Sequence, residues 1–348
     1  MFLAIAACAP GCQLVFPLED VQDKVAHVPV KEETAGAFDL TIDQRVTFDT
    51  TSLLFTGVAM GEAGTATIRQ DNADSDLALM RVAKLTVTQN GQLVITGIKP
   101  LVIIANTIEI DGLVDASADV NGVSGPGGGR PGMGDPGQGG DGANGDAQGV
   151  SNSTSGGGGG GFADGAGDGG RVDCESSSLE GGAAGASIGD AQIALLIGGG
   201  AGGRGGLRCP DPPARLGGPG GGALQLTAFE SITIGQTGRV LAAGGGGRGG
   251  VGSAACPLLD GGGGGGGAGG ALFVDAPLIA NNGRITAFGG GGGGGGGDGV
   301  SSDNDGVDGS TGNALTPGIG GAGRPTKGTF GATVPPTPKR PTVRSVSA

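Results

Sequence analysis

IEIDGLVDA, residues 108–116, shows the pattern on which the fold expected for this chain depends. Ile108 and Ile110 alternate with polar residues, a glycine turn follows, and Leu113-Val114 begins a second apolar segment. Alternation with a period of two is typical of a strand that buries one face. The stretch therefore predicts two short strands joined by a tight turn.

The same unit recurs at residues 85–95, 232–242 and 278–287. One such unit cannot bury its apolar face alone, whereas stacked copies can. Short strands joined by tight bends, with insertions of variable length, predict an all-β fold of the parallel β-helix or solenoid type. An open β-sandwich is the alternative, because strands near 38–96 could pair antiparallel.

Glycine dominates the insertions. The chain has 348 residues, of which 85 are glycine, and it contains no Trp or Tyr. Its core must therefore come from short Val, Ile, Leu and Ala segments spread along the sequence. The runs 156–161, 261–267 and 289–297 are nearly pure glycine. Polyglycine II helices, which have the PPII geometry, pack closely only without side chains, so we expect these runs to form an ordered bundle beside the strands.

The first twelve residues, MFLAIAACAPGC, predict export. Ile5-Ala6-Ala7-Cys8 fits the lipobox of a bacterial lipoprotein, and Cys12 is the second candidate for lipidation. No Lys or Arg precedes them and the apolar stretch is short, which predicts a signal peptide truncated by a late start. An apolar first strand with incidental cysteines is the alternative.

No other segment is apolar over the roughly 18 residues of a membrane helix. The sequence therefore predicts a protein held at the outer membrane or cell surface by a lipid anchor. An exported location permits disulfides, so one bridge is expected, with the pairing left open. The candidates are Cys174, Cys209 and Cys256.

Composition divides the chain into five parts. They are a truncated lipoprotein signal region (1–12), a tether (13–37), a β-rich N-terminal part (38–118), a glycine-rich body (119–330) and a proline-rich basic disordered tail (331–348).

No cofactor is expected for this chain, apart from one acidic loop that is a candidate calcium site. Carboxylate and amide oxygens on a glycine-turned loop are ligands that Ca²⁺ prefers. An EF-hand register beginning at Ser301 places Gly312 where a bidentate Glu is expected, so a solvated acidic loop is the favoured interpretation. The candidate ligands are Asp298, Asp303, Asn304, Asp305 and Asp308.

Two classes of function fit poorly. The net charge of −13 argues against a nucleic-acid partner, because phosphate binding needs clustered Lys and Arg. A catalytic triad would have to use His27, the only histidine, which lies in the expected tether. No catalytic residue is predicted.

Residues 98–105 and 108–118, with the glycine tracts that follow, resemble the glycine-rich exported lipoproteins of myxobacteria and their relatives. The resemblance covers about residues 85–297. More loosely, the chain is similar to mycobacterial PE-PGRS proteins and filamentous adhesins. Its pure glycine runs are similar to the polyglycine bundles of phage tail adhesins and a snow-flea antifreeze protein.

The resemblance implies a passive surface role. We therefore expect a non-enzymatic, lipid-anchored structural or adhesive protein, with a glycan or cell-surface partner. The alternative is a polysaccharide-binding or polysaccharide-processing β-helix protein, although Tyr and Trp platforms for sugar rings are absent.

Overall fold

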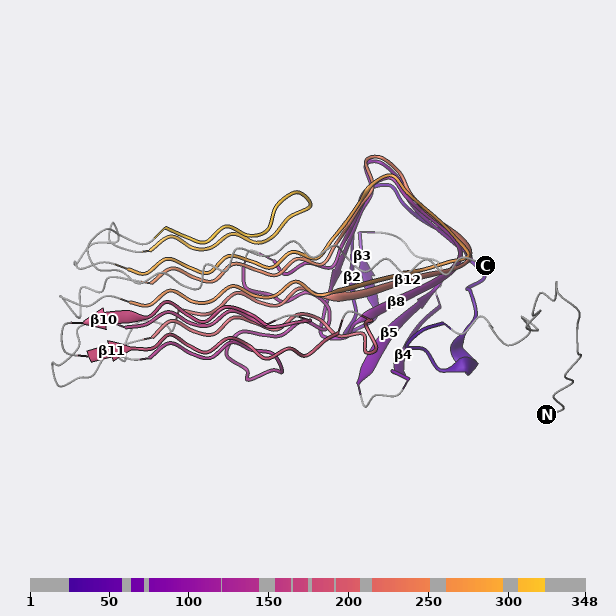
Figure 1. The fold of residues 1–348 in the computed structure, drawn as a ribbon. Coiled ribbons are helices and arrows are strands. Elements are labelled where there is room, and N and C mark those ends of the chain that lie inside the picture. The colour runs from indigo at the N-terminus through magenta and orange to yellow at the C-terminus, as the bar shows by residue number, and fades with distance from the viewer. Residues whose placement is uncertain are drawn as a thin grey trace, which may run out of the picture.

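The computed structural model describes most of the chain beyond residue 24. The described ranges are 25–57, 64–71, 75–119, 121–143, 154–163, 165–174, 177–190, 192–206, 215–250, 261–296 and 306–322. Two β-sheets form one side of the molecule, and long glycine-rich segments extend away from them (Figure 1). A single turn of 3-10 helix, Val30–Glu32, precedes the first strand.

Sheet A is mixed and has eight strands. They are β1 (Leu40–Ile42), β4 (Gly64–Arg69), β5 (Asp76–Arg81), β6 (Lys84–Val87), β8 (Leu101–Ile110), β12 (Ala223–Ile234), β14 (Ala271–Asp275) and β15 (Leu278–Asn281). Only the β4–β5 pair is antiparallel.

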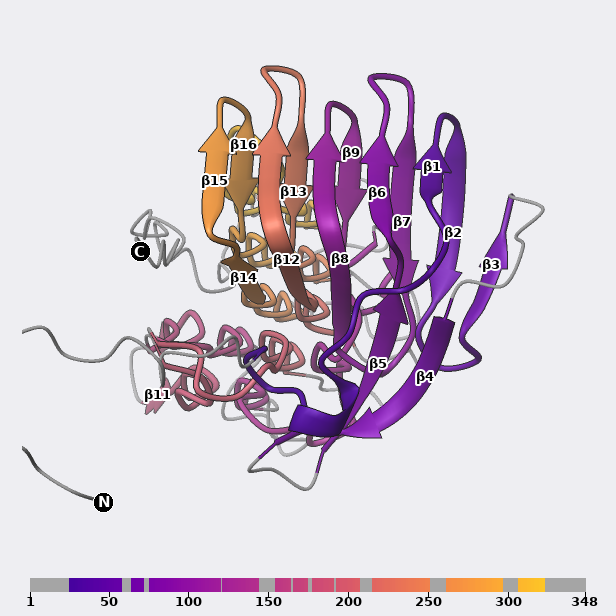
Figure 2. The same ribbon diagram turned by 90° about the vertical axis from the view of Figure 1, so that its right-hand side faces the viewer.

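Sheet B is also mixed and has six strands. They are β2 (Arg45–Asp49), β3 (Leu54–Thr56), β7 (Gln92–Thr96), β9 (Leu113–Asp115), β13 (Arg239–Leu241) and β16 (Arg284–Thr286). The β2–β3 pair is antiparallel and the other ladders are parallel. Short turns join strands of sheet A to strands of sheet B, so the sheets stand as two layers (Figure 2).

The two layers share one core. In the parallel ladders of sheet A, Leu85 pairs with Ile108 and Ile108 pairs with Ile232. All three are fully buried, and they belong to one cluster with Val46 and Val114 of sheet B. The alternation recognised in the sequence therefore directs one face of each strand into the space between the sheets.

The first half of β8 is buried on both faces. Leu101 and Ile103 point into the core between the sheets, whereas Val102 and Ile104 belong to a second cluster on the opposite face. Continuous apolar runs such as Leu101–Ala105 are typical of parallel strands covered on both sides. Residues 25–28 and 193–196 contribute Val25, Val28, Ile193 and Leu196 to this cover.

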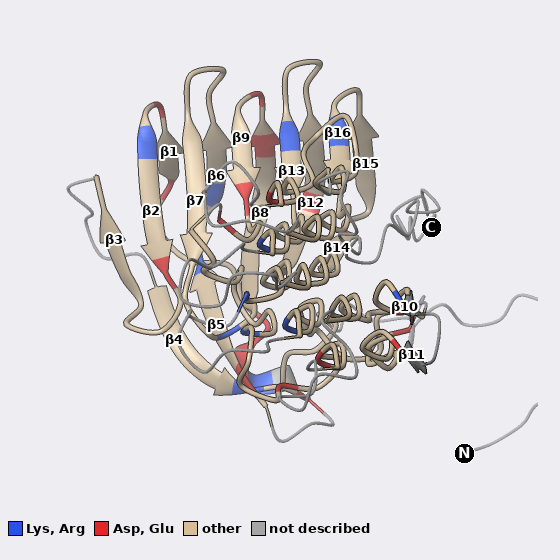
Figure 3. Cartoon of the chain, turned by 90° about the vertical axis from the view of Figure 1, so that its left-hand side faces the viewer, with Lys and Arg blue, Asp and Glu red and all other residues tan. Residues whose placement is uncertain are grey.

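The glycine-rich segments form a separate part, which we call the glycine layer: the described residues of 125–222, 242–270 and 287–322. Figure 3 shows these segments nearly end-on beside the sheets. The six amides of residues 156–161 donate in turn to the carbonyls of Gly170, Gly263, Gly140, Gly167, Gly266 and Gly137. Residues three apart thus donate to the same neighbouring segment, which is the repeat of a PPII helix with about 3 residues per turn.

Steric crowding explains why these positions are glycine. A β-carbon at Gly158 would overlap the carbonyl oxygen of Ala183, and one at Gly293 would overlap that of Arg248. Neither glycine has a φ in the left-handed region. The requirement is therefore the space occupied by neighbouring backbone, not an unusual backbone conformation.

The expected all-β parallel β-helix or solenoid is wrong. Both main sheets contain an antiparallel pair, and the only further sheet in the described residues is the antiparallel pair β10 (Val172–Cys174) and β11 (Ser177–Leu179). Most of the described glycine layer is not strand. Apolar alternation marks a strand but carries no information on the direction of the neighbouring strand. The glycine segments form backbone hydrogen bonds with the three-residue repeat of a PPII helix and not with the pattern of a β-ladder.

Candidate functional site

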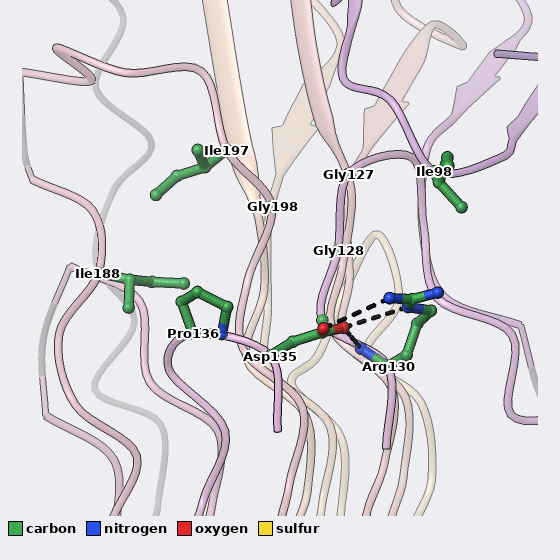
Figure 4. Close-up of a pocket in the computed structure, with 10 residues that line it drawn as sticks. Ile98, Gly127, Gly128, Arg130, Asp135, Pro136, Ile188, Ile197 and Gly198 are labelled. Carbon is green, nitrogen blue, oxygen red and sulfur yellow. Dashed lines mark hydrogen bonds and ion pairs between the residues drawn. The ribbon is translucent and has the colours of Figure 1, made fainter. Parts of the chain in front are cut away.

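A pocket of about 510 Å³ opens where the sheets meet the glycine layer (Figure 4). Glycine backbone and a few larger side chains line it. The lining residues are Ile98, Gly127, Gly128, Gly129, Arg130, Asp135, Pro136, Ile188, Ile197 and Gly198.

A tight loop shapes one wall of this pocket. Gly132, Gly134 and Gly137 have φ values of 74°, 71° and 72°, in the left-handed region that glycine adopts at little cost. These bends turn the chain back on itself between residues 130 and 137. As a result, Arg130 and Asp135 meet at the pocket wall.

Arg130 holds the carboxylate of Asp135 in place. The backbone amide of Arg130 donates to Oδ2 of Asp135 at 2.9 Å, and Nε donates to the same oxygen at 3.2 Å. Partial burial alone would raise the pKa of Asp135. The hydrogen bonds and positive charge of Arg130 outweigh that effect and lower the pKa below its ordinary value.

The chemistry of the pocket suits binding. Three isoleucines and a proline provide apolar contacts, and the ion pair provides one polar edge. The lining side chains include no hydroxyl, thiol or imidazole. This set can hold an apolar group with a polar end, but it offers no nucleophile beside a general base.

This pocket was not predicted from the sequence. Its one visible signal is the string of glycines and prolines between Arg130 and Gly137, which marks a turn. Ile98, Ile188 and Ile197 come from separate segments, so only the tertiary structure brings them together.

Most of the predicted calcium ligands lie outside the described residues: Asp298, Asp303, Asn304 and Asp305. Asp308 is described, and both of its carboxylate oxygens accept hydrogen bonds from protein. Arg248 Nη1 donates to Oδ2 and the Gly249 amide donates to Oδ1, each at 2.7 Å. Within the described ranges, His, Cys, Asp and Glu side chains form no group of three that could hold a metal ion.

Most of the predicted cysteine sites also lie outside the residues that the structure describes. Cys8, Cys12, Cys209 and Cys256 fall there. Cys174 ends β10, where its backbone is paired with Ser177. Lipidation and the disulfide therefore remain predictions.

His27 lies against the body of the protein. Its ring is buried, with Nδ1 2.6 Å from Oε1 of Gln225 and Nε2 2.6 Å from the carbonyl oxygen of Ile193. The ring edge also packs against Phe273. These neighbours give the imidazole a structural role in the second cluster.

The chain matches no protein-family model, no curated protein and no solved structure. Its resemblance to glycine-rich lipoproteins thus stays a prediction. In the described parts of the chain, no helix combines the length and the apolar character of a membrane span.

Proposed function

We propose that this protein is a non-enzymatic structural or adhesive protein of the cell surface. The observation that carries the proposal is the glycine layer, in which backbone hydrogen bonds join segments from distant parts of the chain. Gly157 donates to Gly263, and Gly200 donates to Gly161. At its crowded positions, such as Gly158, the layer has no room for a side chain, so the backbone there is held on several sides.

A rigid glycine layer can present a contact surface at the edge that lies farthest from the two sheets. The ends of several described segments are hydrogen-bonded to one another there: Ser155 donates to Ala143, Gly206 donates to Ser155, and Gly262 donates to Gly206. Figure 1 shows β10 and β11 at the same far end of the layer. The ends of several glycine-rich segments, which are far apart in the sequence, therefore lie together at one edge. A surface built in this way suits contact with a large partner.

Attachment to a membrane is the part of the proposal that rests on sequence alone. Lipid on Cys8, or on Cys12, would hold the protein at the cell surface. The test is palmitate labelling of the Cys8→Ser and Cys12→Ser variants in a bacterium that processes lipoproteins, expressed behind a complete signal peptide. Loss of the palmitate label in one variant supports anchoring. Unchanged labelling of both variants would refute it.

Binding without turnover is the property that tests the adhesive role. The full chain should be screened against a glycan array and whole bacterial cells, with soluble products analysed in parallel. We expect retention of the protein on one surface and no released oligosaccharide. Product release would instead favour the alternative, a polysaccharide-processing protein.

A pair of variants links binding to the layer. Gly158→Ala introduces a methyl group where the carbonyl of Ala183 lies, whereas the nearest atom to a β-carbon at Gly159 is 3.4 Å away. If the layer displays the adhesive edge, Gly158→Ala should weaken cell binding and Gly159→Ala should not. Equal binding by both variants would show that the layer does not present the contact surface.

A further inference from the structure

Three arginines that are far apart in the sequence lie in one row across sheet B. Arg45 pairs with Gln92, Gln92 with Leu113, Leu113 with Arg239, and Arg239 with Arg284. Figure 3 shows the three basic positions at the same height on β2, β13 and β16. The register of the parallel ladders thus creates a basic row that no local motif encodes.

The arginine side chains point away from the core. The residue after each arginine, Val46, Val240 or Ile285, is buried between the sheets. Successive side chains of a strand point to opposite faces, and all three arginines are exposed. Adjacent strands are about 4.8 Å apart, so Arg239 and Arg284 are direct neighbours and Arg45 lies about 14 Å further along the row.

These three charges have no ion-pair partner among the described residues. Like charges directly opposite each other on neighbouring strands destabilise a sheet. The acids nearest in the ladders are Asp115 on β9, and Asp43 and Asp111 in the turns before β2 and β9. The turns that lead into β13 and β16 contain no acid of their own, and the Asp111 carboxylate lies against Gly235 in the first of these turns. Arg239 and Arg284 are paired directly, so they form the more basic end of the row.

Amide side chains accompany this basic end. Gln236 precedes β13 and Asn282 precedes β16, and both residues are exposed. Within the described residues, neither side-chain amide makes a hydrogen bond. Guanidinium groups bind carboxylates, while free amides can donate to and accept from hydroxyl groups.

We propose that this surface, the arginine row with Gln236 and Asn282, binds a linear acidic polysaccharide that carries carboxylates, running across the strands of sheet B. Arg239 and Arg284 hold one uronate group, the two amides contact neighbouring sugar hydroxyls, and Arg45 contacts a carboxylate further along the polymer. The inference rests on the proposed adhesive function and adds to it a second contact surface on sheet B, separate from the far edge of the glycine layer, together with the chemical class of its partner.

Charge and geometry favour this partner over nucleic acid. The protein carries a net charge of −13, which opposes a long, densely charged phosphate chain, and the row supplies only three cations. A polyuronate has fewer charges along its length and many hydroxyls. Its attraction to a short basic row with amides can therefore exceed the long-range repulsion.

The direct test is binding of the full-length protein to alginate, a polymer of uronic acids, measured by isothermal titration calorimetry at low salt. Dextran, which is uncharged, serves as the control polymer. We expect binding to alginate only, with an apparent Kd that rises about tenfold or more in the Arg239→Ala/Arg284→Ala variant, because two charge-assisted contacts are lost. Arg239→Lys/Arg284→Lys should bind with intermediate affinity, since the charge remains and the bidentate geometry is lost.

A charge-matched variant separates this site from a general charge effect. Arg171, which is exposed, and Arg248, which is partly exposed, lie in the glycine layer and pair with Glu180 and Asp308. Arg171→Ala/Arg248→Ala removes the same two charges and should leave the Kd within about threefold of the wild-type value. An equal loss in both double variants would overturn the proposal, as would tighter binding of single-stranded DNA than of alginate. If the wild-type protein binds cells but not alginate, this inference fails while the adhesive function stands.

Discussion

His27 and Gln225 are 198 residues apart in the chain, yet Nδ1 of the histidine lies 2.6 Å from Oε1 of the glutamine. Gln225 sits on β12, in the row between Val102 and Phe273, and its Nε2 also donates to Thr227. His27 therefore attaches the segment before the first strand to the centre of sheet A. Its φ of 66° is unusual for a non-glycine residue, which indicates that these contacts outweigh a local backbone cost.

Replacing His27 by Ala should destabilise the protein. The change removes the His27 contact of Gln225 Oε1 and of the Ile193 carbonyl in a buried site, and each unsatisfied group costs roughly 1–3 kcal/mol. Urea denaturation of the full chain measures the loss. Gln44→Ala is the control, because it removes an exposed hydrogen bond to Gly57 and should change stability by less than about 0.5 kcal/mol. Equal stability of the two variants would contradict the role given to His27.

Single methyl groups should distinguish crowded from open positions in the glycine layer. Gly158→Ala should lower the free energy of unfolding by about 1–3 kcal/mol, as overpacking does, because the backbone carbonyl of Ala183 cannot move aside freely. Gly159→Ala should be neutral, or stabilising by about 0.4–1 kcal/mol through the unfolded chain. Thermal melting and protease resistance are the measurements, and similar behaviour of both variants would count against a packed layer.

A second pair repeats the comparison in the last long glycine run. Gly293→Ala should destabilise, since its β-carbon would overlap the carbonyl oxygen of Arg248. Gly289→Ala meets its nearest atom, the carbonyl oxygen of Gly267, only at 3.4 Å and should be tolerated. The melting temperature of Gly293→Ala should therefore be lower than that of Gly289→Ala.

The Arg130–Asp135 pair should make a small, pH-dependent contribution to stability. Because the pKa of Asp135 is lowered below its ordinary value of 3.8 in the folded protein, its stabilising effect is complete above that value. The effect is lost as the pH falls through the folded-state pKa. Asp135→Asn should therefore cost up to about 1 kcal/mol at neutral pH, typical of a partly exposed pair, and nothing in strong acid. Denaturation curves of both proteins at several pH values test this, and a difference that does not change with pH would refute it.

The core between the two sheets should be sensitive to the loss of side-chain volume. Ile103 is fully buried in the cluster between the sheets, and Ile103→Ala should cost about 2–5 kcal/mol. Leu278, at the start of β15, is 63% exposed, and Leu278→Ala should change stability by less than about 0.5 kcal/mol. Comparable losses at the two positions would show that the sheets do not enclose the core described above.

Local pattern was enough to locate several strands. The alternation at residues 108–116 predicted the end of β8 and all of β9, and both are confirmed. The repeats at residues 232–242 and 278–287 likewise correspond to β12–β13 and β15–β16. These predictions hold because the burial of one strand face imposes a period of two on the sequence.

The sequence by itself determined where several of the strands form and which of their residues face the core, because both depend on neighbours within a few positions. Only the tertiary structure decided the antiparallel pairs, the pocket beside Arg130 and the row formed by Arg45, Arg239 and Arg284. Each of these depends on the register between segments that are distant in the chain. Register is fixed when several strands bury their faces together and the glycine segments form backbone hydrogen bonds with one another. No single stretch of sequence contains that information.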